Sequence, residues 1–190
     1  MPVERSAGII FFRSTPQGRK YLVIRSSYHG EDGKHNFWDF PKGLLEKDED
    51  GMAAAKREAV EEAGIKDYEI ISDFKETVRY FVRRPSGRAS LSAGRDRDKK
   101  AVLKFVAMFL AETKTDTVKL SWEHDTYEWL PYEEAKERLS RKEMQTALLK
   151  AEEFILPKKY TRLLKKYRAE ELQPMPTSRV WPEKRMRRGR

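Results

Sequence analysis

Two apolar runs close to the N-terminus predict a β-hairpin. They have the sequences AGIIFFR (residues 7–13) and YLVIR (residues 21–25), and the polar segment between them contains Pro16 and Gly18. Runs rich in β-branched and aromatic residues on either side of such a turn are typical of paired strands. After a polar loop, the sequence FWDFPKG (residues 37–43) predicts a further short extended stretch.

A helical pattern follows and then gives way to strand patterns. Residues 51–63 are dense in strong helix formers, and Gly64 is placed to end that helix. Mixed strands and helices are typical of a layered α/β or α+β domain. The further expected strands lie at residues 68–72, 74–83, 101–111 and 126–130, and the further expected helices at residues 132–139 and 141–155.

Two polar segments do not fit this alternation. Residues 84–100 have no periodicity and contain two glycines, which predicts a mobile hairpin loop. After Pro157, residues 158–172 predict a basic helix, and residues 173–190 contain three prolines and predict no fixed structure. We therefore expect a domain at residues 1–155 and a helical basic C-terminal extension at residues 156–190.

The positive charge of the chain belongs to that extension. The 190 residues carry a net charge of +9, which first suggests a nucleic acid or an acidic surface as partner. Residues 156–190 contain 12 Lys plus Arg and three Glu, whereas residues 1–155 contain 28 residues of each sign. The charge thus indicates RNA binding only through the extension, and a solvated appendage is the alternative interpretation.

The composition excludes several classes of site. The chain has no cysteine, which excludes disulfides, a thiolate nucleophile, cysteine-based zinc sites and iron–sulfur clusters. No run of about 18 apolar residues occurs, and the N-terminal segment lacks the pattern of a signal peptide. We expect a cytoplasmic protein without a membrane partner.

Three carboxylates share one face of the predicted helix at 51–63. Glu58, Glu61 and Glu62 have the spacing i, i+3 and i+4, at which like charges repel one another. A hard divalent cation such as Mg²⁺ prefers oxygen ligands and would relieve this repulsion. The alternative is an ordinary acidic helix that faces solvent.

The residues around these carboxylates complete a longer motif. Gly43 and five residues precede Glu49, and seven residues separate Glu49 from the pair Arg57–Glu58. The motif closes with the pair Glu61–Glu62, one further residue and Gly64, followed by an apolar residue. In these positions the chain resembles the Nudix hydrolases. The resemblance implies an α/β fold, an α/β/α sandwich with a mixed β-sheet, and hydrolysis of a nucleoside diphosphate linked to a group X with Mg²⁺ or Mn²⁺ as cofactor.

The resemblance also implies roles for single residues. Glu61 and Glu62 would be metal ligands together with the backbone carbonyl of Lys42, and Glu58 would be a ligand or the base that orients water. Arg57 and Glu49 would form an ion pair that holds the catalytic loop against the helix. Metal-activated water needs no covalent nucleophile, so the absence of cysteine is no obstacle.

Further segments are similar to the asymmetric dinucleoside tetraphosphate hydrolases. They are WDFPKG at 38–43, FKETVRY at 74–80, LSWEHDTYEWLPYEEA at 120–135 and KEMQTALLKAEEFI at 142–155. This similarity implies that Glu123 is a metal ligand or the general base and that His124 lies near the phosphates. It also implies that Tyr80 and Tyr127 stack on bases, while Lys42 and Lys104 meet the polyphosphate of a dinucleoside polyphosphate or nucleotide substrate.

Several alternatives stay open at this point. Tyr80 and Tyr127 could equally be strand-packing residues, and Trp38 is expected to pack under the motif rather than touch substrate. The leading hypothesis is cleavage of diadenosine tetraphosphate to ATP and AMP. The basic extension favours an RNA 5′-pyrophosphohydrolase as the alternative, and deoxynucleoside triphosphates and diphosphoinositol phosphates are other candidate substrates. A nucleic-acid-binding module without activity is the non-enzyme alternative.

Overall fold

The structure is a computed structural model that describes residues 2–27, 37–85 and 99–156. Contacts between Cα atoms divide the chain into two units, Met1–Ile155 and Leu156–Arg190. Every described helix and strand belongs to the first unit. Residues 86–98 of the predicted loop and the predicted helix at 158–172 lie outside the described residues.

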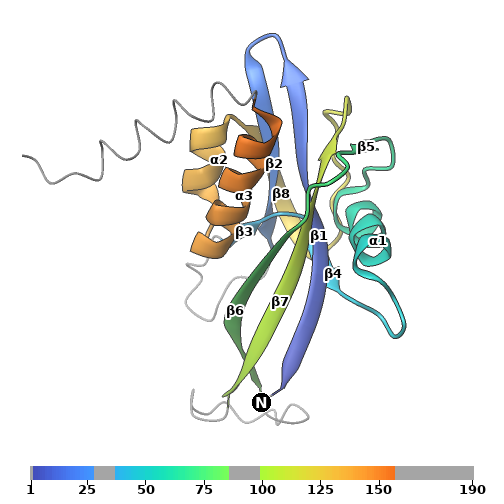
Figure 1. Cartoon of the computed structure of the whole chain (residues 1–190), viewed down its shortest axis with the longest axis vertical. Coiled ribbons are helices and arrows are strands. Elements are labelled where there is room, and N and C mark those ends of the chain that lie inside the picture. The colour runs from blue at the N-terminus through green and yellow to red at the C-terminus, as the bar shows by residue number, and fades with distance from the viewer. Residues whose placement is uncertain (1, 28–36, 86–98, 157–190) are drawn as a thin grey trace, which may run out of the picture. The chain divides into compact units, whose positions relative to one another are not determined.

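The first unit is built on one mixed sheet of eight strands (Figure 1). The strands are β1 (Val3–Thr15), β2 (Gly18–Ser26), β3 (Trp38–Asp39), β4 (Lys42–Leu44), β5 (Glu69–Ile70), β6 (Glu76–Pro85), β7 (Lys99–Glu112) and β8 (His124–Leu130). The longest path through the sheet has the order β3-β2-β1-β7-β5, while β4 pairs with β1, β6 with β7 and β8 with β2. Only the pair β1–β7 is parallel among the described strands.

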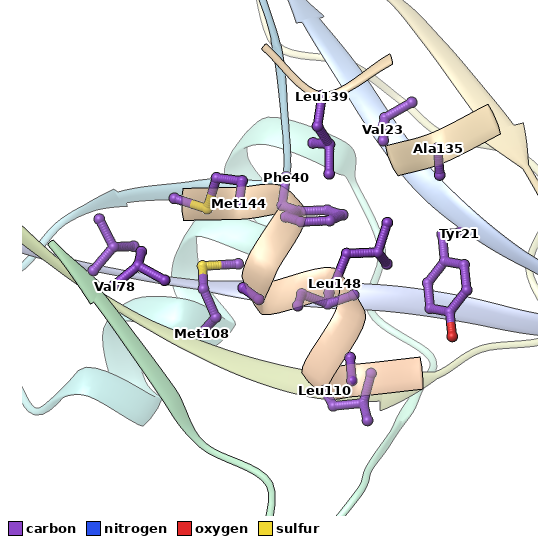
Figure 2. Close-up of a cluster of buried hydrophobic side chains, with 14 of the residues drawn as sticks. Tyr21, Val23, Phe40, Val78, Met108, Leu110, Ala135, Leu139, Met144 and Leu148 are labelled. Carbon is purple, nitrogen blue, oxygen red and sulfur yellow. The ribbon is translucent and has the colours of Figure 1, made fainter. Parts of the chain in front are cut away.

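Helices cover both faces of the sheet, as the sequence resemblance implies. They are α1 (Gly51–Ala63), α2 (Tyr132–Arg138) and α3 (Lys142–Ile155). Side chains of a strand point alternately to the two faces, so Ile9 and Phe11 of β1 pack on the α1 side while Ile10 and Phe12 pack on the α2–α3 side. Figure 2 shows the second of these cores, in which Phe40 and Met108 lie beside Leu148.

The sequence correctly predicts both ends of α1. The side chain of Asp50 caps the helix by accepting the backbone N–H groups of Met52 and Ala53. Gly64 ends it in the left-handed conformation at φ 66°, where a Cβ would lie 2.8 Å from the Cβ of Lys119. The helix that carries the carboxylates is therefore fixed at both termini by its own sequence.

One strand prediction and one loop prediction differ from the structure. The expected strand at 68–72 is reduced to Glu69–Ile70, because the chain turns immediately afterwards at Asp73, which has a φ of 65°. The β6–β7 ladder reaches Pro85 and Lys99, so both ends of the predicted loop at 84–100 belong to strands.

In the described part of the chain, no helix is long and apolar enough to cross a membrane.

Candidate active site

Small residues decide which face of α1 packs on the sheet. Ala54, Ala55 and Ala59 are fully buried on the sheet side, and this orientation also turns Glu58 and Glu62 inward. Only 8% of Glu58 and 9% of Glu62 is exposed. The Glu61 side chain is 55% exposed. One turn of helix thus presents two buried carboxylates and one exposed carboxylate.

Glu62 is tied to the entry of the motif. Its Oε2 atom accepts the backbone N–H of Lys42 at 2.8 Å. In an extended strand the N–H and C=O of one residue point to the same side, and the next residue directs its own pair to the opposite side. The carbonyl of Pro41 points to β1, where it accepts the N–H of Ile9. The Lys42 carbonyl therefore points away from β1, to the side on which Glu62 lies.

The side chain of Lys42 forms an ion pair with Asp39, a residue for which the sequence predicted no role. Its Nζ atom lies 3.0 Å from Oδ2 of Asp39, which is 5% exposed and whose Oδ1 accepts the N–H of Phe40 at 2.9 Å. Burial, the largest single effect, lowers the pKa of Lys42, but the interactions with Asp39, Tyr80 and Glu62 together outweigh it and the net shift is upward. Lys42 therefore stays protonated. The i, i+3 spacing of the pair was the available sequence signal.

Gly43 gives Glu58 its place. A Cβ on Gly43 would overlap with the carboxylate of Glu58, so any larger residue here would displace that carboxylate. The motif glycine is thus required by packing rather than by a positive φ, since Gly43 is not among the residues with φ above zero.

Arg57 joins the loop to the helix. Its Nε and Nη2 atoms donate to the two carboxylate oxygens of Glu49 at 3.0 and 2.9 Å, and Nη2 also donates to the carbonyl of Leu44 at 2.8 Å. Its Nη1 atom donates to Oε1 of Glu58 at 2.8 Å and to Oε2 of Glu61 at 2.9 Å. The predicted Glu49–Arg57 ion pair is present, and the same guanidinium also bridges two of the acidic residues.

The buried carboxylates resist ionisation. Burial raises the pKa of Glu62 to about 7, although the nearby Lys42 lowers it, and the charges of Glu58 and Glu123 raise it further. Burial likewise raises the pKa of Glu58, against the opposing effect of Arg57, and Glu61 and Glu123 add to the rise. Glu123 thus lies close enough for its charge to act on both helix carboxylates, and its role as metal ligand or general base stays a prediction.

His124 is a neutral neighbour of Glu62. Its Nε2 atom lies 4.0 Å from Oε1 of Glu62, and its Nδ1 atom lies 3.4 Å from Oγ of Ser121. Burial and the charge of Lys42 lower the pKa of His124 to about 4. The segment that carries Glu123 and His124 is held to β2 by a backbone hydrogen bond, in which Ser27 donates its N–H to the carbonyl of Glu123 at 2.8 Å.

The structure does not bring the two candidate stacking tyrosines together. Tyr80 is 6% exposed and belongs to the α2–α3 core, where the guanidinium of Arg141 covers its ring at 4.2 Å from the centroid. Tyr127 is half-buried and packs on the opposite, α1 side. Lys104 pairs with Tyr80 across the β6–β7 ladder. Trp38, which was expected to pack under the motif rather than touch substrate, is buried in the α2–α3 core.

The carboxylates suit a divalent cation in chemistry. Among the described residues, no three carboxylate or imidazole side chains already converge as a ligand set. Arg57 takes only Oε1 of Glu58 and Oε2 of Glu61, and the other oxygen of each accepts no hydrogen bond from the described part of the chain. Glu58 and Glu62 are buried with raised pKa values, and Glu58 and Glu61 each keep a spare oxygen, so this set fits a hard, oxygen-preferring ion.

Comparisons with known proteins agree with this geometry. A family model described as "NUDIX domain" matches residues 2–150. The chain is 31% identical over 157 residues to a Mus musculus protein named bis(5′-nucleosyl)-tetraphosphatase [asymmetrical], covering 80% of this chain and 95% of that protein. It is also 31% identical over 83 residues to an RNA pyrophosphohydrolase of Bartonella henselae, covering 42% of this chain and 46% of that protein.

A solved structure is similar as well. The structure of a C. elegans Ap4A hydrolase binary complex superposes with a TM-score of 0.60 and 27% sequence identity, over 86% of this chain and 99% of that one.

Proposed function

Because the chain belongs to the NUDIX domain family, whose members cleave phosphoric anhydride bonds, we propose that it is a metal-dependent hydrolase of dinucleoside tetraphosphates. The proposed reaction splits diadenosine tetraphosphate asymmetrically, into ATP and AMP. The observation that carries the proposal is the pair of buried helix carboxylates, Glu58 and Glu62, within electrostatic reach of Glu123. The substrate rests on the asymmetrical tetraphosphatase of Mus musculus, which the chain matches over 95% of its length.

Four carboxylates and one carbonyl would hold the Mg²⁺ or Mn²⁺ ion. We assign this role to Glu58, Glu61, Glu62, Glu123 and the backbone carbonyl of Lys42. When bound, such an ion polarises phosphoryl oxygens and lowers the pKa of a water molecule. The N–H of Lys42 fixes one oxygen of Glu62, and Arg57 fixes one oxygen of each of the other two helix carboxylates, so the remaining oxygens are oriented in advance.

Either Glu58 or Glu123 would accept the proton of the attacking water. Burial raises the pKa of Glu58, which makes it a stronger base than an exposed carboxylate. Glu123 lies on the opposite loop, whose backbone is fixed by Ser27. Protein groups that bind the phosphates would be Lys42 and Lys104 as cations and His124 as a neutral donor, since its low pKa keeps the ring uncharged.

The adenine bases of the substrate would contact aromatic side chains. Base stacking on an aromatic ring contributes about 1–3 kcal/mol per base. Tyr80 offers such a ring only after Arg141 moves off its face. Tyr127 lies on the other side of the sheet, so each tyrosine would serve a different part of the substrate.

A substrate panel tests the proposal. The full-length protein is incubated with Mg²⁺ and diadenosine tetraphosphate, deoxynucleoside triphosphates or diphosphoinositol phosphates, and the products are separated by ion-exchange chromatography. Equal amounts of ATP and AMP from the dinucleotide are expected, with the highest kcat/KM of the panel. Two ADP molecules, or no cleavage, would contradict the assignment.

An RNA 5′-pyrophosphohydrolase is the second candidate. It is favoured by the similarity to the Bartonella henselae enzyme and by the basic extension at residues 156–190. That similarity covers less than half of either chain. Release of pyrophosphate from triphosphorylated RNA at a higher kcat/KM than diadenosine tetraphosphate cleavage would favour it. Binding of nucleic acid without any hydrolysis would favour the non-enzyme alternative.

A further inference from the structure

The ends of three strands extend beyond the helices that cover the sheet. In Figure 1 the N-terminal part of β1 and the adjoining parts of β6 and β7 run past α1, α2 and α3. The sheet face that α1 covers elsewhere is therefore uncovered at these strand ends, and apolar side chains there are in contact with solvent. Val3 is 54% exposed and Phe81 is 59% exposed. Exposed apolar groups that lie together on one sheet face commonly mark a binding surface.

The strand register orders this surface into rows. Arg5 of β1 and Arg79 of β6 both pair with Phe105 of the central strand β7, so that a half-buried aromatic ring lies between two arginines. The next row is apolar, because Val3 and Phe81 both pair with Leu103. We call these six residues the open face.

A cavity continues the open face towards α1. It has a volume of about 330 Å³ and is lined by Arg5, Lys75, Thr77, Phe105 and the small residues of the strand–helix junction. The ammonium group of Lys75 lies 5.9 Å from the ring centroid of Phe109. In the described segments, no carboxylate lies within ion-pair distance of Arg5, Lys75 or Arg79, and no carboxylate lines this cavity.

We propose that the open face binds single-stranded nucleic acid, at a site separate from the candidate active site. Bases would stack on Phe105 and Phe81, and phosphates would pair with Arg5, Arg79 and Lys75. Cations that alternate with exposed aromatic rings on a sheet are the means by which proteins hold unpaired nucleotides. The charge fits this occupant, since the three basic residues are exposed and have no acidic partner among the described residues, so they are available to pair with phosphates.

The carboxylates of the motif lie on the other side of Leu45. A neighbouring cavity is lined by Glu46, Asp48, Glu49 and Glu4, and only Val3, Arg5 and Leu45 contribute to both cavities. An anionic strand is therefore repelled from that second cavity and attracted to the open face. We therefore expect the strand to bind along β6 and β7 rather than across the acidic segment at residues 46–49.

Binding of a fluorescein-labelled 12-nucleotide RNA to the full-length protein tests the proposal by fluorescence anisotropy. The variant R5E/R79E should weaken binding at least about tenfold, and it should reduce the slope of log K against log salt concentration by about 1.4, for two lost phosphate contacts. The control K66E/K114E makes the same change of charge at exposed lysines elsewhere. Equal weakening by both variants, or absence of RNA binding by the wild type, would overturn the proposal.

A second variant separates stacking from folding. F81L/F105L keeps the apolar contacts and removes only the rings, so it should retain its thermal unfolding midpoint and weaken RNA binding about tenfold. RNA that carries 4-thiouridine should cross-link to peptides that contain Phe81 or Phe105, whereas cross-links confined to residues 156–190 would contradict the site. If the variants instead abolish a concentration-dependent dimer in sedimentation and leave RNA binding unchanged, the face binds a second copy of the chain and the proposal is wrong.

Discussion

The carboxylate of Glu62 accepts the backbone N–H of Lys42 at 2.8 Å, so the last turn of α1 is bonded directly to β4. The same residue is 9% exposed, and the negative charges of Glu58 and Glu123 act on its carboxylate and raise its pKa. This arrangement positions one oxygen of Glu62 at a cost in electrostatic repulsion. A bound cation would remove this repulsion. The protein without the cation should therefore have a measurably lower free energy of unfolding.

The first prediction concerns the pH dependence that Glu62 imposes on the metal-free protein. Its pKa is about 7 in the folded state and about 4.5 when unfolded. Because the folded state holds the proton more tightly, this contribution to the free energy of unfolding is fully present below pH 4.5 and is lost as the pH rises through 7. Replacement of Glu62 by glutamine should therefore stabilise the metal-free protein at pH 8 by about 1–3 kcal/mol.

Urea unfolding in EDTA at pH 4.5 and pH 8 measures this difference. The stabilisation by E62Q should be small at pH 4.5 and large at pH 8. The matched control is E137Q, which alters an exposed residue of α2 and should have no such dependence. Equal effects of E62Q at the two pH values would contradict the assigned shift.

His124 should act in the opposite direction. Its pKa is about 4 when folded and 6.5 when unfolded, so the folded state favours the neutral ring. This contribution is fully present above pH 6.5 and is lost as the pH falls towards 4. Compared with wild type, H124Q should lose less stability between pH 6.5 and pH 4. NMR titration of the histidine ring gives the pKa directly, and a value near 6.5 would show that the ring is solvated.

Much of this site can be predicted from the sequence, because its parts are local. The spacing of Glu58, Glu61 and Glu62 places them on one helix, and Asp50 and Gly64 define the ends of that helix. The ion pair of Arg57 with Glu49 also follows from the motif. Arg57 also bridges Glu58 and Glu61, and this contact depends on side-chain rotamers that sequence spacing does not specify.

The contacts that the sequence could not predict are those between distant segments. Arg141 covers Tyr80 because α3 packs against β6, a contact between elements about 60 residues apart. The separation of Tyr80 and Tyr127 onto opposite faces likewise depends on the register of two strands. A shift of one residue would exchange these faces, so periodicity alone could not decide which core each tyrosine enters.

The bridging role of Arg57 leads to a further prediction. Lysine keeps the charge but cannot donate to Glu49, Glu58, Glu61 and the Leu44 carbonyl at once. R57K should therefore raise the Mg²⁺ concentration for half-maximal activity by about 10–100-fold, as expected for groups that orient metal ligands. The control is R138K on α2. An unchanged Mg²⁺ requirement in R57K would show that the guanidinium does not orient the carboxylates.

Gly43 provides a steric prediction. A methyl group at this position overlaps with the carboxylate of Glu58, so G43A should displace that carboxylate and reduce kcat/KM about 100-fold or more. Gly51 is a suitable control, since a Cβ there makes only contacts of 3.9 Å. G51A should retain activity and gain slight stability, because alanine is a better helix former. Retained activity in G43A would exclude Glu58 from the reaction.

The most direct measurement is the hydrolysis of diadenosine tetraphosphate in ¹⁸O-labelled water with Mg²⁺, for wild type and E62Q side by side. Water attack at a metal site predicts equal ATP and AMP with one ¹⁸O atom incorporated per turnover. E62Q should lower kcat/KM by about 10³, equivalent to about 4 kcal/mol of transition-state stabilisation. Formation of ADP, hydrolysis that persists in EDTA, or an E62Q variant with wild-type kcat/KM would contradict the account.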